Sequence, residues 1–257
     1  MKVVILAGGY GSRLSEETTI RPKPMVEIGG KPILWHIMKM YSLHGHNEFI
    51  ICCGYKGQMI KDYFLNYKHH NTNFTVDLTS GNVLSASNHD DDWTVTLVDT
   101  GHDSQTGGRL LAIKDFIDTD TFCMTYGDAV SSVDVTELIK FHKQKGQLAT
   151  VTSVRTPSRF GALELNGDNV KEFTEKPRIS DAWINGGFFV LDKGVFSYLE
   201  DEMTVLEGHP LTQLALDGEL NAFKHEGFWH AMDTMKDKME LEKMIINGDL
   251  PWFSSKN

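Results

Sequence analysis

Three glycines and an arginine follow the first apolar run of the chain. The run Lys2 to Leu6 predicts a buried strand, and the stretch LAGGYGSRL begins at Leu6, so its glycines lie where that strand ends. Glycine lets the backbone approach a ligand closely, and free N–H groups there can donate to phosphate oxygens. A tight turn without function is the alternative for such a stretch by itself.

Two common phosphate-binding loops are excluded by spacing. Leu14 stands where a dinucleotide-binding fingerprint would have its third glycine. Gly30-Lys31 is followed by Pro32, where a P-loop would have Ser or Thr. The glycine stretch is therefore predicted to hold a phosphate in another way.

Two cations strengthen the phosphate interpretation. Arg13 follows the last glycine of the stretch, and Lys23 stands between Pro22 and Pro24, which restrict the local backbone. The formal net charge of the 257 residues is −10, so a broad nucleic-acid surface is not expected. An anionic ligand must then be held by local cations such as these two.

The elements that carry these residues read as βαβ units around a mainly parallel sheet. Strands are predicted at residues 2–6, 48–53, 73–78, 93–98, 121–126 and 148–154, and helices at residues 32–43, 56–67, 107–116, 133–145 and 234–247. Asp128 follows the strand 121–126 and thus lies at a carboxyl edge, where open α/β sheets gather ligands. Further short strands at 161–165, 170–173 and 184–191 predict a β-rich extension, and the polar stretch 85–92 predicts a solvated loop.

The glycine stretch belongs to a longer pattern. Six stretches together resemble the signature of the sugar-1-phosphate nucleotidyltransferases. They are LAGGYGSRL, PKPMVEIGGKPIL, YGD ending at Asp128, EKP at 175–177, INGGFFV at 184–190 and GFWHAMDT around Asp233. The match spans nearly the whole chain. Within that family, PILWHIMKMYS, FIICCGYKG, LVDTG, TGGRL and INGGFFVL look most like the cytidylyltransferases that use glucose 1-phosphate.

The resemblance implies an α/β, Rossmann-like nucleotide-diphospho-sugar transferase fold with a central mainly parallel mixed sheet flanked by helices. The length and the hydrophobic content of the chain predict one domain over 1–257, with a nucleotide-binding half at 1–155 and a sugar-binding and C-terminal half at 156–257. The expected reaction is the Mg²⁺-assisted in-line attack of α-D-glucose 1-phosphate on CTP, which forms CDP-glucose and pyrophosphate. Another base, dTTP or UTP, or another phosphorylated acceptor is the alternative, and a non-catalytic nucleotide-sugar sensor is a third reading.

The resemblance also assigns roles to residues. Catalysis is expected from Arg13, Lys23, Asp128 and Asp233, with both aspartates as Mg²⁺ ligands. Nucleotide contacts are expected from Leu6, Ala7, Gly8, Gly9, Tyr10, Gly11, Ser12, Arg13, Lys23, Thr106, Gly107 and Arg109. Sugar-phosphate contacts are expected from Tyr126, Glu175, Lys176, Asn185 and Gly186.

Blander interpretations stay open for several of these residues. Asp128 and Asp233 can each be a cap or turn residue. Lys176 can be the lysine of a turn, and Arg109 can be an exposed helix residue. Asn185 and Gly186 can mark a β-bulge. His36 can be a packed or exposed imidazole rather than a ligand. Tyr10, Ser12, Ala129 and His209 depart from the cytidylyltransferase pattern. Ser12 keeps a hydroxyl, whereas Tyr10, Ala129 and His209 leave the identity of the acceptor open.

The cysteines and the apolar stretches indicate the compartment. Cys52, Cys53 and Cys123 form no CxxC pair, so buried, reduced thiols are expected rather than disulfides or a zinc site. A signal peptide and a membrane-spanning stretch are not expected, so a cytoplasmic protein without a membrane partner is predicted. Members of the resembled family form homo-oligomers, and we expect one here.

Overall fold

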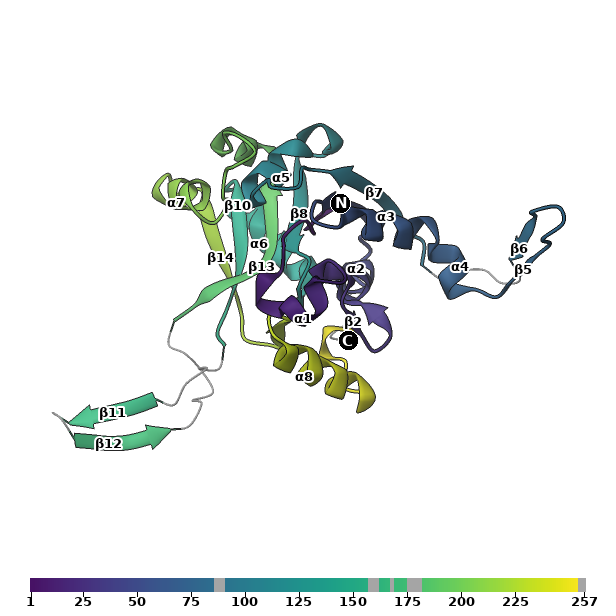
Figure 1. The fold of residues 1–257 in the computed structure, drawn as a ribbon. Helices are drawn as coiled ribbons and strands as arrows, with labels where there is room; N and C mark the ends of the chain where they lie inside the picture. Colours follow the sequence, from purple (N-terminus) through teal and green to yellow (C-terminus); the bar gives the residue numbers. More distant parts are fainter. Residues whose placement is uncertain (86–90, 157–161, 167–168, 175–181, 254–257) are drawn as a thin grey trace.

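A seven-stranded sheet forms the centre of the molecule (Figure 1). The computed structural model describes residues 1–85, 91–156, 162–166, 169–174 and 182–253. The sheet order is β14-β10-β13-β8-β1-β4-β7. The strands are β1 (Val3–Leu6), β4 (Glu48–Cys53), β7 (Thr94–Asp99), β8 (Thr121–Tyr126), β10 (Ala149–Val154), β13 (Ile184–Asp192) and β14 (Leu220–His225). All neighbouring strands run parallel except β13, which is antiparallel to β8 and to β10.

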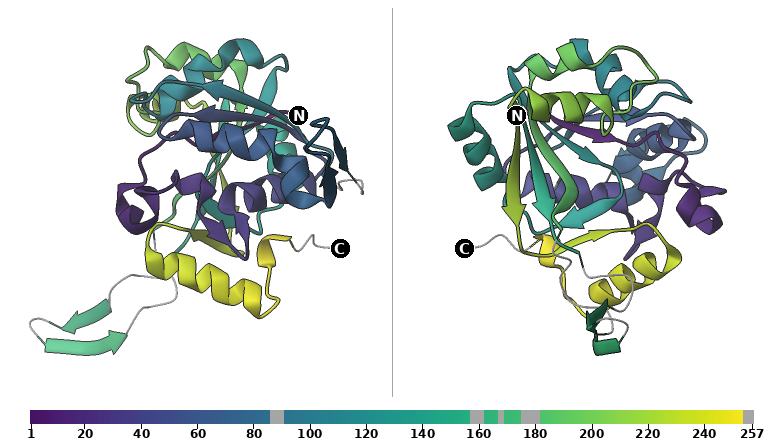
Figure 2. Two further views of the ribbon diagram at one scale, coloured as in Figure 1. Left: turned by 45° about the vertical axis from the view of Figure 1, so that its right-hand side comes forward. Right: turned by 90° about the vertical axis from the view of Figure 1, so that its left-hand side faces the viewer.

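Helices cover both faces of this sheet, as the sequence predicts (Figure 2). The helices are α1 (Ser15–Thr18), α2 (Ile33–Ser42), α3 (Gly57–Leu65), α4 (Tyr67–Asn71), α5 (Thr106–Ala112), α6 (Val135–Lys145), α7 (His209–Leu216) and α8 (Met235–Ile246). Short 3₁₀ turns are η1 (Ser12–Leu14), η2 (Lys23–Met25), η3 (Lys114–Phe116), η4 (Lys193–Tyr198) and η5 (Pro251–Phe253). One core joins the sheet to α2, α3, α6 and α8, and the other joins it to α5, η4 and α7.

The alternation of side chains along β1 explains the two cores. Val3 and Ile5 pack in the first core, whereas Val4 and Leu6 pack in the second. Successive side chains of a strand point to opposite faces, so an unbroken apolar run is what a strand buried on both faces requires. The same holds for β4, whose buried Cys52 and Cys53 are free thiols as predicted.

Four two-stranded sheets lie outside the central one. They pair β2 (Glu27–Ile28) with β3 (Lys31–Pro32), β5 (Phe74–Val76) with β6 (Val83–Ser85), β9 (Ala129–Ser131) with β15 (Trp229–Ala231), and β11 (Ala162–Asn166) with β12 (Asn169–Thr174). The β11–β12 hairpin projects from the body in every view, and β5–β6 lies beyond α4 (Figures 1 and 2). The small β9–β15 sheet is the one that builds the site described below.

Two expectations from the sequence need correction. The strand at 184–191, predicted as part of a β-rich extension of the domain, belongs to the central sheet as β13. The polar stretch 85–92 is not simply solvated, because the Asp91 side chain is 8% exposed and pairs with Lys39 at 2.8 Å. Residues 86–90 of this stretch lie outside the described residues. Within the described ranges, no helix has the length and apolar character needed to cross a membrane.

Candidate active site

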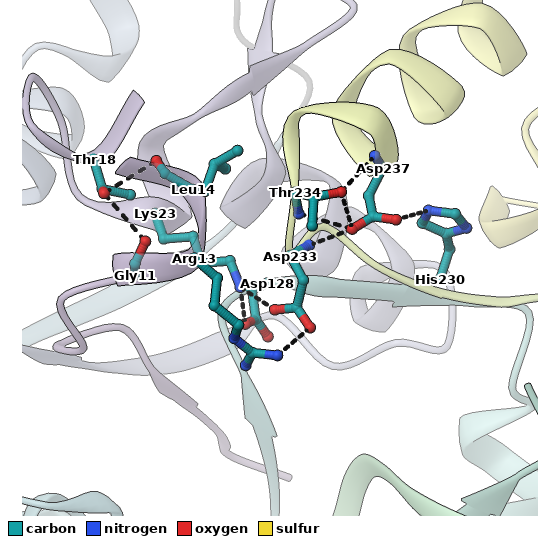
Figure 3. Close-up of polar contacts among 10 residues, drawn as sticks. All are labelled: Gly11, Arg13, Leu14, Thr18, Lys23, Asp128, His230, Asp233, Thr234 and Asp237. Carbon is teal, nitrogen blue, oxygen red and sulfur yellow. Dashed lines mark hydrogen bonds and ion pairs between the residues drawn. The ribbon is translucent and has the colours of Figure 1, made fainter. Parts of the chain in front are cut away.

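The glycine loop after β1 is shaped by a left-handed residue and a buried threonine. Gly11 has φ 63° and ψ 35°, in the region that favours glycine. The hydroxyl of Thr18 donates to the carbonyls of Gly11 and Leu14, at 3.1 Å each (Figure 3). A Cβ on Gly11 would crowd the side chains of Thr18 and Lys23. The position therefore requires glycine for its backbone angle and for space.

Arg109 holds the same loop from its buried side. Its guanidinium donates to the Gly8 carbonyl at 3.0 Å, to Thr100 Oγ1 at 2.9 Å and to the Gly101 carbonyl at 2.7 Å. A Cβ on either Gly8 or Gly54 would overlap this guanidinium. Arg109 is 4% exposed, so the reading of it as an exposed helix residue is wrong. Its N–H groups mainly order the backbone around the loop.

Lys23 is presented by η2, directly after the extended Pro22. Its Nζ donates to Asp128 Oδ2 and to Asp233 Oδ1, at 2.7 Å in each case (Figure 3). Burial by itself lowers the pKa of Lys23, but the two carboxylates outweigh burial and raise the pKa above its ordinary value. Lys23 is therefore a buried cation between two anions.

Asp128 and Asp233 meet because β9 and β15 pair. Asp128 directly precedes β9, and Asp233 closely follows β15. The two strands are antiparallel with Ala129 opposite Ala231, and the Met232 N–H donates to the Asp128 carbonyl at 2.8 Å. This register brings the two carboxylates to the same side of Lys23, although they are far apart in the sequence.

The Asp233 carboxylate has a separate cation on each oxygen. Oδ1 is 2.7 Å from Lys23 Nζ, and Oδ2 is 2.7 Å from Arg13 Nη1. The Arg13 side chain is 69% exposed, so it can also reach an anion in front of the loop. Two carboxylates that converge on one cation also offer the oxygen ligands that Mg²⁺ prefers, so this pair fits a divalent metal.

Two cavities adjoin at these charged groups. The first, which we call the loop cavity, has a volume of about 280 Å³, and the second, the sheet cavity, about 310 Å³. The loop cavity is lined by Leu6, Ala7, Gly8, Gly9, Gly11, Ser12, Arg13, Lys23, Pro24, Ser104, Gln105, Thr106, Arg109, Tyr126, Gly127 and Asp128. The sheet cavity is lined by Arg13, Tyr126, Asp128, Ala129, Asn185, Gly186, Gly187, Glu207, Trp229, Ala231 and Asp233. Arg13, Tyr126 and Asp128 thus face both cavities.

Two predicted nucleotide contacts are absent from the lining of the loop cavity. The Tyr10 hydroxyl donates to Asp103 Oδ1 at 2.5 Å, and its ring lies 5.0 Å from that of Tyr55. The Gly107 N–H donates to the Thr204 carbonyl at 2.9 Å, which ties the start of α5 to the segment before α7. The other predicted nucleotide contacts all line that cavity.

The predicted sugar-phosphate contacts divide in the same way. Tyr126, Asn185 and Gly186 line the sheet cavity, whereas Glu175 and Lys176 lie outside the described residues. The pairing of β10 with β13 shifts register between Asn185 and Phe189, an irregularity that is consistent with the β-bulge interpretation. The irregular part of β13 is also the part that lines the cavity, so a structural bulge and a sugar-binding role are compatible here.

Glu207 is a site residue that the sequence did not reveal. Its Oε2 accepts from Thr106 Oγ1 at 2.6 Å, and its Oε1 accepts from the Tyr126 hydroxyl at 2.5 Å. Burial and the neighbouring Glu207 raise the pKa of Tyr126, so its phenol stays protonated. Glu207 therefore links Thr106, which lines the loop cavity, to Tyr126, which lines both cavities. A single glutamate in a loop carries no pattern from which this role could be read.

Comparisons with known proteins agree on the class of protein that this site resembles. Residues 2–246 match the nucleotidyl transferase family. The chain is 52% identical over 253 residues to the glucose-1-phosphate cytidylyltransferase of Salmonella typhimurium, covering 98% of each chain. It is 47% identical to the "Probable glucose-1-phosphate cytidylyltransferase" of Bacillus subtilis, covering 98% of this chain and 99% of that one. The solved structure of HddC from Yersinia pseudotuberculosis has the same fold, with a TM-score of 0.71 at 23% identity over 95% of this chain and 99% of that chain.

Proposed function

The chain belongs to the nucleotidyl transferase family, and from this premise we propose that it joins CTP and α-D-glucose 1-phosphate into CDP-glucose and pyrophosphate. Two relatives that bear the name glucose-1-phosphate cytidylyltransferase, at 52% and 47% identity over nearly the full length, support this pair of substrates. The protein is an enzyme rather than a sensor, because a sensor has no need for cations and carboxylates gathered at one junction.

The observation that carries the proposal is the junction of the two cavities. Arg13 and Asp128 face both cavities, and Lys23 and Asp233 lie beside them within hydrogen-bond distance. A nucleotide in the loop cavity and a sugar phosphate in the sheet cavity would bring their phosphates together at this junction. Two cavities that meet at a charged cluster are what a transfer between two anions requires.

The chemistry needs charge neutralisation and alignment more than a protein nucleophile. A phosphate oxygen of glucose 1-phosphate forms a new bond to the α-phosphorus of CTP, and the bond from that phosphorus to pyrophosphate breaks. Lys23 stabilises the charge that grows at the α-phosphate, and Arg13 neutralises the departing pyrophosphate. The glycine loop supplies backbone N–H groups for the remaining phosphate oxygens.

A divalent metal, Mg²⁺ in our proposal, is held by Asp128 and Asp233. The fit rests on their carboxylates, which already converge on a single cation at 2.7 Å. When bound, the metal adds positive charge at the reacting phosphate. Lys23 and Arg13 balance the charge of the two carboxylates.

The base is read by the part of the loop cavity formed by Ser104, Gln105 and Thr106. Arg109 contributes less directly, because its N–H groups are engaged with backbone carbonyls and Thr100. Cytosine presents an acceptor and an amino donor where uracil presents the reverse. A pocket built for cytosine leaves buried polar groups unpaired when UTP enters, so CTP is preferred by at least about 10².

In this proposal the sugar phosphate is held by Tyr126, Glu175, Lys176, Asn185 and Gly186. Asn185 lies next to Tyr126, with its amide nitrogen 3.4 Å from the hydroxyl.

The cytoplasm is the proposed location, because both substrates are soluble phosphates and the three cysteines are reduced thiols.

A homo-oligomer is also part of the proposal. The arm formed by α4 and the β5–β6 hairpin exposes large apolar side chains, with Leu78 92% and Leu84 71% exposed. An apolar groove of about 290 Å³ beside edge strand β7 adjoins the end of α3. An isolated hairpin gains little stability by itself, so we assign these surfaces to a second copy of the chain.

Pyrophosphate release by the purified protein tests the function. CTP, UTP, dTTP and GTP are each combined with glucose, galactose and mannose 1-phosphate in the presence of Mg²⁺. We expect the highest kcat/KM for CTP with glucose 1-phosphate. Equal turnover with UTP or dTTP would reject the cytidylyl assignment, turnover only with another phosphorylated acceptor would replace glucose 1-phosphate, and no release with any pair would favour the sensor.

A further inference from the structure

The turn between β15 and α8, which carries Asp233, is held by one carboxylate. Oδ2 of Asp237 accepts the Asp233 N–H at 3.0 Å, the Thr234 N–H at 2.7 Å and the Thr234 hydroxyl at 2.9 Å (Figure 3). A single oxygen thus binds two consecutive backbone amides and a side chain. Asp237 itself touches neither Asp128 nor Lys23 in these contacts.

Part of this arrangement is ordinary helix capping. Thr234 is the N-cap of α8, and its hydroxyl accepts the Asp237 N–H at 3.3 Å, which completes a capping box. A capping box requires only the bond from Asp237 to the N-cap N–H. The additional bond to the Asp233 N–H lies outside the helix and is not needed to cap it.

The additional bond completes a run of fixed amides. The Met232 N–H is bound to the Asp128 carbonyl at 2.8 Å, and the next two amides are bound to Asp237. The backbone on both sides of the Asp233 side chain is therefore anchored. One anchor leads to Asp128 and the other to Asp237.

The other oxygen of Asp237 faces β15. Its Oδ1 lies 3.7 Å from His230 Nε2, which is buried without a hydrogen-bond partner among the described residues. The His230 ring stacks on Phe228, with ring centroids 6.3 Å apart and an interplanar angle of 11°. Both oxygens of the Asp237 carboxylate thus have neighbours, the backbone of the turn at Oδ2 and His230 at Oδ1.

We propose that Asp237 is a positioning residue that sets the Asp233 carboxylate for the divalent metal, an inference that rests on the proposed function. Each Asp233 oxygen lies 2.7 Å from a different cation, Lys23 or Arg13. A shift of the backbone at Asp233 would change both contacts and the position of its oxygens relative to Asp128. Removal of a group that hydrogen-bonds to a metal ligand and orients it typically lowers metal affinity by about 10–100-fold.

Three variants separate positioning from capping. Asp237→Ala removes both functions, Asp237→Asn keeps an oxygen acceptor for the Asp233 N–H, and Thr234→Val removes the hydroxyl of the capping box while leaving the Asp233 anchor. Glu240→Ala is the matched control, because Glu240 lies on the same helix, 3.9 Å from His230 Nε2. Asp237→Asn also serves if Asp237→Ala fails to fold.

Two measurements report on the proposal without turnover. Amide hydrogen exchange across residues 232–237 reports on the anchor, and loss of the free Mn²⁺ signal in electron paramagnetic resonance, with CTP present, reports on metal affinity. We expect Asp237→Ala to speed exchange at Asp233 and to weaken Mn²⁺ binding about 10-fold or more. Asp237→Asn should recover most of that affinity, and Thr234→Val should lower Tm while keeping the affinity of the wild type.

Turnover provides the third measurement. The Mg²⁺ concentration for half-maximal pyrophosphate release should rise about 10-fold in Asp237→Ala, with a smaller change of kcat at saturating Mg²⁺. Unchanged exchange at Asp233, or an equal loss of Mn²⁺ affinity in Thr234→Val, would overturn the positioning role. Loss of a second bound Mn²⁺ would replace it with direct ligation. Failure of the wild type to bind Mn²⁺ at all would reject the proposed metal instead, while the exchange data would still report on the anchor.

Discussion

At the scale of single residues, the site is a balance of two carboxylates and two cations. Asp233 shares its two oxygens between Lys23 and Arg13, and Asp128 shares Lys23 with it. Lys23 is 7% exposed, so its charge is weakly screened and acts strongly on any nearby phosphate. The same lysine neutralises the two carboxylates that would hold a divalent metal in the proposed function.

Lys23→Met should separate these two effects. Loss of the ammonium removes stabilisation of the α-phosphate, so kcat should fall by about 10² or more. The two carboxylates then lack their shared cation, so the nucleotide-free variant should bind Mn²⁺ more tightly than the wild type. Steady-state kinetics and paramagnetic resonance measure both, with exposed Lys140→Met as control. An unchanged kcat would reduce Lys23 to a structural residue.

Asp128→Asn and Asp233→Asn test the proposed metal ligands. The amide keeps the shape and an acceptor for Lys23 but loses the negative charge that holds a divalent ion. We expect turnover to fall by about 10² or more, with the fold kept as judged by circular dichroism. Pyrophosphate release over a Mg²⁺ titration is the measurement, and exposed Asp249→Asn is the control. Wild-type Mg²⁺ dependence in both variants would remove the assignment.

At the scale of elements, the glycine loop depends on space that two glycines leave for one arginine. Gly54→Ala should displace Arg109 from its carbonyl partners and destabilise the fold by about 1–3 kcal/mol, the cost of leaving buried polar groups unpaired. Gly9→Ala is the matched variant, because its Cβ would meet nothing within 4 Å. It should keep the wild-type Tm but raise the KM for CTP, since Gly9 lines the loop cavity. Thermal unfolding and kinetics check both, and equal Tm values for the two variants would contradict the role of Arg109.

Helix α2 carries a buried histidine that makes folding sensitive to pH. His36 Nε2 donates to the Ile28 carbonyl at 3.0 Å, and Nδ1 accepts from Trp252 Nε1 at 3.3 Å. Burial lowers the pKa of His36 to about 4. The native imidazole therefore stays neutral at pH 5, where the unfolded one is protonated. Its contribution to stability is present above about pH 6.5 and is lost as pH falls toward 4.

We expect this histidine to contribute about 2 kcal/mol to the loss of stability between pH 7.5 and pH 5. His36→Gln should lower stability at both pH values but lose less between them. Urea unfolding at the two pH values measures the difference, and His69→Gln, at an exposed position of α4, should keep the wild-type difference. An equal loss in wild type and His36→Gln would show that other groups carry the acid sensitivity.

At the scale of the whole molecule, the arm of α4 and β5–β6 decides the proposed assembly. We expect the wild type to sediment as an oligomer at micromolar concentration, and the double variant Leu78→Glu, Leu84→Glu to sediment as a smaller species, because charges on these side chains oppose burial. Leu216→Glu is the control, because Leu216 is 76% exposed on α7, away from the arm. A wild-type monomer would reject the oligomer, and an unchanged size of the double variant would place the interface elsewhere.

The local features of this site could be predicted from the amino-acid sequence. Each of these features is visible in a few consecutive residues and has a direct physical meaning. They are the apolar run before Gly8, the prolines around Lys23 and the strand that ends before Asp128. The family resemblance extended this reading to Asp233, and its nucleotidyl transferase expectation is confirmed. The roles of the individual site residues stay predictions until the variants are measured.

Contacts between distant segments were decided only by the tertiary structure. Asp128 and Asp233 meet through β9 and β15, which have 3 residues each and are too short to show a periodicity in the sequence. The burial of Arg109 against Gly8 and Gly54, the bridge made by Glu207 and the anchor made by Asp237 depend on which side chains the folded backbone brings together. Local patterns specify which groups a segment carries, whereas strand register and close packing determine which groups meet.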